Sequence, residues 1–236
     1  MEEKFNGLVI AKTEYGENDR IVKIFTLEKG TVSANLKGVK RAGAKLKFAS
    51  EPFCFAEFTC SERAGRRTVT GASLKDSFYP VRESIEKFFA GGTILEFIRR
   101  FAREEITSPK LFLAAVDGLK ELAYGDKSPH YTLCRFLLSA LEISGYAINT
   151  DGCFNCGKEI ETRAFFDAFS GGFLCEDCFH GEGREINAAT YFALKKVAEE
   201  KAVTQEETVF ALRLLDFYIK IKTEEKLNSM QELLKL

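Results

Sequence analysis

The stretch of sequence that decides the fold lies between residues 153 and 178. It reads Cys153-Phe-Asn-Cys156, then eighteen residues, then Cys175-Glu-Asp-Cys178. Two Cys-x-x-Cys pairs at this separation are the sequence form of a tetrahedral zinc site with four cysteine ligands. We therefore predict that one Zn2+ is bound by Cys153, Cys156, Cys175 and Cys178.

The predicted zinc site is structural rather than catalytic. Four thiolates fill the tetrahedral coordination sphere, so no position stays open for a substrate or an activated water molecule. Gly157 and the Gly171-Gly172 pair supply the flexible backbone that tight cysteine turns need. Two alternatives stay open: His180 replaces one cysteine as a ligand, or the two pairs are unrelated thiols or part of a disulfide framework.

The remaining cysteines and the composition indicate a soluble globular protein of a reducing compartment. Cys54, Cys60 and Cys134 are scattered, and an odd total of seven fits a cytoplasmic protein with one zinc site better than a disulfide scaffold. The 236 residues, 45% hydrophobic and 29% charged, are enough for two domains. The sequence contains neither an N-terminal apolar segment nor a run of about 18 apolar residues, so we expect neither secretion nor membrane insertion.

The first 75 residues have the pattern of β-strands. Short runs rich in Ile, Val and Phe alternate with turn residues such as Glu28-Lys29-Gly30. The expected strands are residues 8–10, 20–27, 31–37, 53–60 and 67–74. Five short strands without a helical period predict a small barrel of the OB type.

From Tyr79-Pro80 onward the sequence has a helical period. Apolar residues recur at helical spacing in residues 85–102, 111–122 and 133–141. Start signals for these and later helices are Ser108-Pro109, Ser128-Pro129, Asn187 and the capping box Thr204-Gln-Glu-Glu207. Gly91-Gly92 is a candidate position for a break or bend, and we expect the last dozen residues to form a fraying tail.

The sequence thus predicts an α+β protein of two domains. Residues 1–79 form the N-terminal five-stranded OB-type barrel, and residues 80–236 form a mainly helical domain. The cysteine segment, at about residues 150–183, is inserted between helices of the second domain as a zinc ribbon. Its expected strands are residues 164–169 and 172–174.

Charge is distributed unevenly, although the whole chain has a net charge of −1. Residues 20–75 contain twelve basic and four acidic side chains, a net charge of +8, whereas residues 76–236 have a net charge of −6. The densest basic run lies between residues 37 and 47, and Arg63, Arg66 and Arg67 form a second cluster. The residues expected to contact nucleic-acid phosphates are Lys37, Lys40, Arg41, Lys45, Lys47, Arg66 and Arg67.

The basic run favours a binding function over a catalytic one. Cationic side chains along a flexible loop of a small barrel form an electrostatic funnel for a polyanion, whereas the alternative is a solvated basic loop. His130 and His180 lie outside any His-x-Glu or His-Glu-x-x-His motif, and the sequence has neither a Walker A loop nor a Gly-x-Gly-x-x-Gly segment. We therefore expect a protein that is not an enzyme.

Several further motifs occur in order along the chain. Val9-Ile10-Ala11-Lys12-Thr13 and Tyr15-Gly16-Glu17-Asn18-Asp19 are followed by the run of residues 21–26 and by Gly30. Lys37-Gly38-Val39-Lys40-Arg41, Pro52-Phe53 and Gly145-Tyr146 come next, before the two cysteine pairs. This ordered set resembles the bacterial RecO family of recombination and repair mediators, and the likeness covers nearly the whole chain.

The resemblance implies an N-terminal OB fold, a helical C-terminal domain with an embedded zinc module, and a non-enzymatic role. It implies binding of single- and double-stranded DNA and annealing of complementary strands. It also implies action with RecR to load RecA onto strands coated by single-strand-binding protein, in the cytoplasm and in association with the nucleoid. Some members lack the zinc cysteines, so Zn2+ binding is a prediction about this sequence.

Two other classes of function are compatible with the same residues. In a protein–protein scaffold, the basic loop docks an acidic partner and the zinc ribbon docks a second one. A zinc-dependent enzyme is disfavoured because the thiolates leave no open coordination position. Electrophoretic mobility with an oligonucleotide, repeated across salt concentrations, separates a scaffold from a DNA-binding protein.

Overall fold

The computed structural model describes residues 2–181, 183–224 and 226–236, and the chain divides into two compact units, Met1–Gly125 and Asp126–Leu236. The elements of the N-terminal unit are β1 (Glu2–Tyr15), β2 (Asp19–Thr26), β3 (Gly30–Leu36), η1 (Phe48–Ser50), β4 (Phe55–Arg63), β5 (Arg66–Asp76), η2 (Tyr79–Arg82), α1 (Ile85–Phe101) and α2 (Pro109–Tyr124). Those of the C-terminal unit are α3 (Pro129–Ile143), β6 (Ala164–Asp167), β7 (Gly172–Leu174), η3 (Glu176–Cys178), β8 (Arg184–Ile186), α4 (Ala188–Ala198), α5 (Gln205–Thr223) and α6 (Asn228–Leu233).

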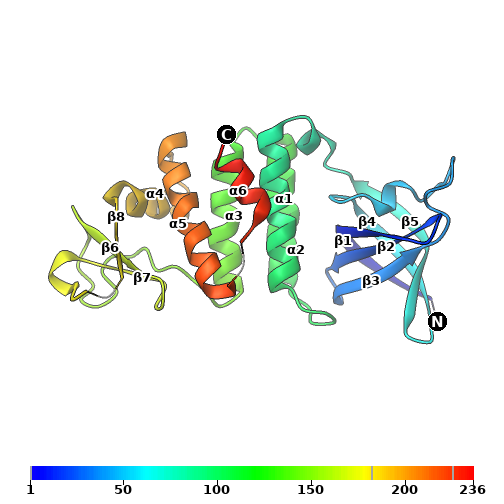
Figure 1. The fold of residues 1–236 in the computed structure, drawn as a ribbon, viewed down its shortest axis with the longest axis horizontal. Coiled ribbons are helices and arrows are strands. Elements are labelled where there is room, and N and C mark those ends of the chain that lie inside the picture. The colour runs from blue at the N-terminus through cyan, green and yellow to red at the C-terminus, as the bar shows by residue number, and fades with distance from the viewer. Residues whose placement is uncertain (1, 182, 225) are drawn as a thin grey trace. The chain divides into compact units, whose positions relative to one another are not determined.

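The strands of the N-terminal unit form a closed barrel in the order β1-β2-β3-β5-β4, which confirms the predicted OB-type barrel (Figure 1). Long β1 pairs with β4 through residues 2–8 and with β2 through residues 7–15, with a register shift between Val9 and Ala11. Such a bulge bends a strand and increases its twist, which lets one strand close a small barrel. Only β3 and β5 pair in parallel, through Ala34↔Arg67 and Asn35↔Thr68.

The barrel interior is apolar and follows the period of two that strands impose. Val32, Ala34 and Leu36 of β3 point into the core, so Ser33 and Asn35 lie on the outer face. The rings of Phe5 and Phe58 stack in the same core with their centroids 6.1 Å apart. Because the apolar residues of each strand face the barrel interior, the alternate residues of the same strand face outward.

Helix α1 runs without a break through Gly91-Gly92, so the bend considered from the sequence does not occur. A Cβ atom at Gly91 would lie 2.9 Å from Val81 Cγ1 and 3.0 Å from Phe53 Cε1. The absence of a side chain lets the helix approach these residues closely. Gly91 thus serves the packing of the helix.

The C-terminal unit confirms most of the predicted helix starts. The side chains of Ser128 and Asn187 accept hydrogen bonds from Tyr131 N and Ala189 N, and Thr204 forms the complete capping box with Glu207. The prediction that the last dozen residues form a fraying tail is wrong for most of them. Helix α6 follows Leu227, and Leu227, Met230 and Leu233 are fully buried, since packing rather than local propensity orders this segment.

The cysteine segment forms a small sheet in the order β7-β6-β8 (Figure 1). The predicted pair β6 and β7 is present, but β8 was missed because three residues carry too short a pattern to recognise. Within the described ranges, none of the helices is long and apolar enough to cross a membrane.

Replacing Gly91 tests the packing of α1. Gly91→Leu should lower the free energy of unfolding by about 1–3 kcal/mol, because the new side chain overlaps Val81 and Phe53. Lys120→Leu, which adds the same side chain at an exposed position of α2, is the control and should change it by less than about 0.5 kcal/mol. Equal stability of the two variants in urea denaturation would contradict the close approach.

Candidate metal centre and nucleic-acid interface

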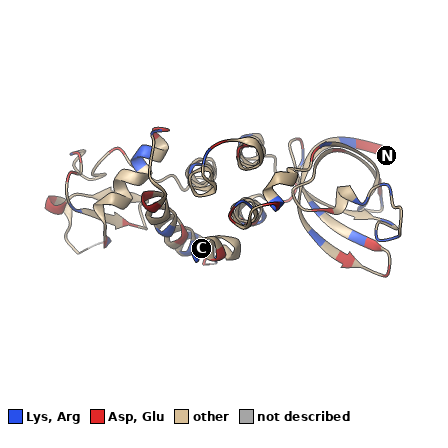
Figure 2. Ribbon diagram, turned by 90° about the horizontal axis from the view of Figure 1, so that it is seen from above, with Lys and Arg blue, Asp and Glu red and all other residues tan. Residues whose placement is uncertain are grey.

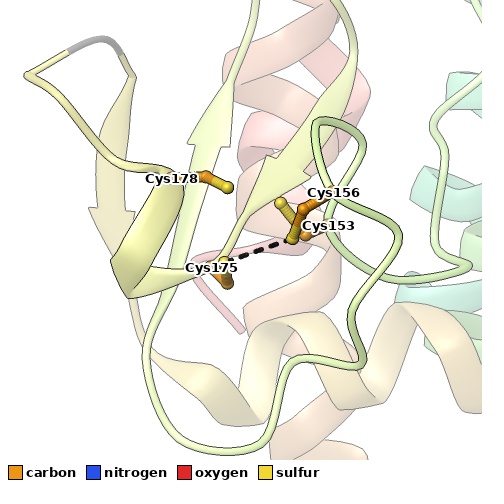
Figure 3. A group of neighbouring side chains, drawn as sticks. All are labelled: Cys153, Cys156, Cys175 and Cys178. Carbon is orange, nitrogen blue, oxygen red and sulfur yellow. Dashed lines mark hydrogen bonds between the residues drawn. The ribbon is translucent and has the colours of Figure 1, made fainter.

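The four cysteines of the C-terminal unit converge on one point. Their Sγ atoms all lie within 4.8 Å of one another, and Cys156 Sγ is 3.8 Å from Cys175 Sγ (Figure 3). In a tetrahedron with Zn–S bonds of about 2.3 Å, the sulfur atoms are about 3.8 Å apart. The donor set therefore fits a tetrahedral thiolate site for Zn2+. His180 is exposed and does not belong to this group.

Local backbone hydrogen bonds shape both cysteine turns. Gly157 N donates to Cys153 O at 2.8 Å, and Cys178 N donates to Cys175 O at 3.2 Å. Phe154 N also donates to Phe173 O at 2.9 Å, which ties the first turn to β7. Because both turns are held by the backbone, the two sulfur pairs face each other across a preformed site.

The thiols differ in acidity. Burial raises the pKa of Cys153, but backbone N–H groups of Cys175, Cys156 and Asn155 outweigh it and lower the pKa to about 6. For Cys178, the Asn155 side chain lowers the pKa, but the nearby Cys156 sulfur and burial outweigh it and raise the pKa to about 12. Four thiolates at this distance repel one another, so the fully ionised set needs a bound cation.

The basic run of the N-terminal unit lies on the loop that joins β3 to β4, residues 37–54, which we call the basic loop. Gly38 N donates to the Asp19 carboxylate at 2.7 Å, and Lys40 N donates to Asn18 O at 3.0 Å. Val39 and Ala49 are buried in the barrel core. The loop is therefore anchored at several points and is not the flexible chain that the sequence suggested.

The structure separates the predicted phosphate contacts into two groups. Among the described residues, six exposed cations of the basic loop and the β4–β5 turn have side chains without an ion-pair or hydrogen-bond partner, as do Lys4 of β1 and Lys75 of β5. The six are Lys37, Arg41, Lys45 and Lys47 of the basic loop, and Arg63 and Arg66 at the β4–β5 turn. Lys40 instead pairs with Glu14 at 2.9 Å. Blue segments mark the loops of the barrel in Figure 2.

Arg67 belongs to the barrel's internal structure. Its side chain is 18% exposed and pairs with Glu3 at 3.0 Å, Glu105 at 3.3 Å and Glu62 at 3.5 Å. Burial raises the pKa of Glu3, but hydrogen bonds from Lys29 and Arg67 outweigh it, so the pKa lies below the ordinary carboxylate value. With three carboxylates around it, Arg67 holds strands together and has little positive charge left for a phosphate.

A groove of about 900 Å³ opens on the outer face of the barrel beside these loops. Residues of all five strands line it, together with Lys37 of the basic loop and the β4–β5 turn; among them are Tyr15, Asn35, Arg63 and Arg66. The sequence did not reveal this groove, because it depends on the parallel closure of β3 against β5. In OB folds the face of strands 2 and 3 and the loops beside it bind oligonucleotides.

The closed five-stranded barrel defines the class of an OB-fold protein, extended by helices and a four-cysteine module. The chain belongs to the family of recombination protein O, RecO. The model of the family's N-terminal part matches residues 1–78, and the model of its C-terminal part matches residues 82–231. The resemblance found in the sequence is thereby confirmed.

Curated relatives carry the name "DNA repair protein RecO". The protein of Streptomyces griseus subsp. griseus is 33% identical over 73% of this chain and 73% of its own length. That of Acetivibrio thermocellus is 28% identical over 76% of this chain and 71% of its own. That of Bacillus pumilus is 24% identical over 99% of this chain and 96% of its own. Membership of this family supports a role in DNA repair and recombination.

Replacing Arg67 tests its structural role. Arg67→Met should lower the free energy of unfolding at neutral pH by about 2–3 kcal/mol, because Glu3 keeps a half-paired, largely buried charge. The difference from wild type should shrink as the pH falls, since a carboxylate with a lowered pKa loses its contribution once it is protonated. Arg66→Met, at an exposed and unpaired neighbour, is the control. Equal stability of both variants would contradict the assignment.

Proposed function

We propose that this protein is a non-enzymatic recombination mediator that binds single- and double-stranded DNA and anneals complementary single strands. With RecR, it helps to load RecA onto single-stranded DNA coated by single-strand-binding protein. Family membership supports the recombination role. The observation that carries DNA binding is the set of six unpaired, exposed cations on the basic loop and at the β4–β5 turn, of which Lys37, Arg63 and Arg66 line a groove of the OB barrel.

Charge pairing within the barrel supports this proposal over a solvated basic surface. Glu3, Glu14 and Glu51 pair with Arg20, Lys29, Lys40 and Arg67, whereas the other four cations of the basic loop have no partner among the described residues. Phosphates bound there would release condensed counterions, which is the main source of sequence-independent affinity for DNA. Neutralised strands also repel each other less, which favours annealing.

The two domains have separate tasks in this proposal. The barrel, residues 1–79, binds DNA. Residues 80–236 provide a helical platform for protein partners and for the cysteine segment, about residues 150–183, which we call the cysteine module. In that module, Lys158 pairs with Asp177 and Arg163 pairs with Glu176 and Glu185. Because these cations already have carboxylate partners, the module is a poor phosphate-binding surface.

Salt dependence tests DNA binding directly. If six cations neutralise phosphates, the logarithm of the affinity for single-stranded DNA should fall with the logarithm of salt concentration with a slope of about −4. Arg41→Glu with Lys45→Glu should reduce the magnitude of the slope from about 4 to about 3 or below. It should also weaken binding to all sequences alike. Fluorescence anisotropy with a labelled oligonucleotide across a salt series measures both quantities.

The matched control carries the same charge change on α5. Arg213→Glu with Lys220→Glu alters two exposed cations of the C-terminal unit and should leave affinity and slope near those of wild type. DNA affinity that is unchanged in the basic-loop variant would exclude the loop as the DNA site. It would favour a scaffold that docks an acidic protein there.

We further propose that Cys153, Cys156, Cys175 and Cys178 hold one structural Zn2+. When bound, the ion supplies a fixed cross-link between the loop after α3 and the segment after β7. The apparent binding free energy of structural zinc sites is about 10–16 kcal/mol, which is comparable to the whole stability of a typical domain. The site would therefore support the fold of the module.

Elemental analysis of freshly purified protein should give one zinc per chain. Removal by a strong chelator should unfold residues 150–183 locally and expose their amides to hydrogen exchange. DNA affinity of the barrel should change less than about two-fold, because the barrel belongs to the other compact unit. Protein that contains no metal, or a module that stays protected after chelation, would contradict the structural zinc site.

A further inference from the structure

The groove on the barrel opens where the parallel pairing of two strands is short. β3 and β5 share only the pairs Ala34↔Arg67 and Asn35↔Thr68, and the groove lies over this junction. Its lining combines hydroxyl and amide groups of Ser33, Asn35 and Ser61 with the cations Lys37, Arg63 and Arg66. A cavity that brings such polar groups and cations together suits a base together with its phosphates.

Asn35 contributes an unused acceptor at this place. Its residue lies on the outer face of β3, between Ile21 of β2 and Thr68 of β5. The Oδ1 atom is buried, and among the described residues it has no hydrogen-bond donor. A buried acceptor without a partner is unfavourable. Oδ1 is shielded from solvent, but the Asn35 residue lines the groove, so a rotation of the carboxamide presents Oδ1 to a ligand that supplies a donor.

We propose that the groove holds an unpaired nucleobase and that the Asn35 carboxamide binds its Watson–Crick edge. This inference rests on the DNA-binding function proposed above. A carboxamide offers one acceptor oxygen beside donor N–H groups. The Watson–Crick edge of every base offers a donor next to an acceptor, so Asn35 pairs with any of the four. In a duplex these atoms are already paired, and the groove selects single strands without selecting a sequence.

The surroundings of Asn35 supply the other contacts that a single strand needs. The Tyr15 ring is 52% exposed and lines the groove, where it offers a stacking surface for the same base. Lys37, Arg63 and Arg66 line the groove as well and have no partner among the described residues. Base and backbone would thus be bound at one place, whereas the rest of the basic loop contacts phosphates of either DNA form.

Asn35→Leu removes the carboxamide at nearly constant size. Its affinity for a mixed-sequence 30-mer single strand should fall about 3- to 10-fold, while its affinity for the same sequence as a duplex should stay within about two-fold. Thr13→Leu, on the outer face of β1 and outside the groove lining, is the matched control and should change neither. Anisotropy titrations of both forms at one salt concentration measure the ratio.

A strand of abasic sites tests the same idea with the wild-type protein. It should bind more weakly than the normal single strand, by at least the factor that Asn35→Leu loses, because it lacks both the base edge for Asn35 and the ring face for Tyr15. Asn35→Leu should therefore discriminate between the two strands less than wild type does. The proposal is overturned if wild-type protein binds the abasic strand as tightly as the normal one, or if Asn35→Leu weakens single strand and duplex equally. Failure of this inference can be told apart from failure of the proposed DNA-binding function. If the basic loop does not bind DNA, the variant Arg41→Glu with Lys45→Glu keeps its affinity for both the single strand and the duplex.

Discussion

A largely buried cation, Arg67, lies where β5 closes the barrel against β3. Arg67 pairs with Ala34 across the junction, and its guanidinium contacts Glu3 of β1, Glu62 of β4 and Glu105 beyond α1. Two residue pairs of β3 and β5 are in register, and the ion pairs of Arg67 join β5 to β1, to β4 and to the segment of Glu105, whose N–H donates to Thr31 O of β3 at 3.4 Å. Since three carboxylates surround Arg67, its positive charge is neutralised within the barrel. The unpaired cations of the basic loop and the β4–β5 turn form the basic surface.

The C-terminal unit meets a different physical problem. Its cysteine module has few apolar residues of its own, and Cys153, Phe165 and Leu174 form a small core there. A core of this size orders a short segment poorly, which is why small modules use metal ions or disulfides. The backbone turns around each cysteine pair bring the four sulfurs together. The helices of the C-terminal unit have an apolar core that includes Leu137, Leu194 and Leu215, whereas the cysteine module has only a small core of its own.

Charge pairing explains how a chain with a net charge of −1 can present a basic surface. In the barrel, carboxylates lie beside cations such as Arg20, Lys40 and Arg67, while four other cations of the basic loop have no carboxylate partner among the described residues. In the cysteine module, Lys158 and Arg163 have carboxylate partners. The three-dimensional neighbours of each residue therefore decide which cations hold the fold and which face solvent without a partner.

The sequence by itself determined the five strands, the helix starts at Ser128, Asn187 and Thr204, the grouping of the four cysteines and the family. These features rest on local periodicity, capping and spacing, which neighbouring residues express directly. Only the tertiary structure decided that Arg67 is internal, that Gly91 packs and does not bend α1, and that α6 is buried. It also created the groove at Asn35. Each of these depends on residues far apart in the chain, whose contacts no local pattern encodes.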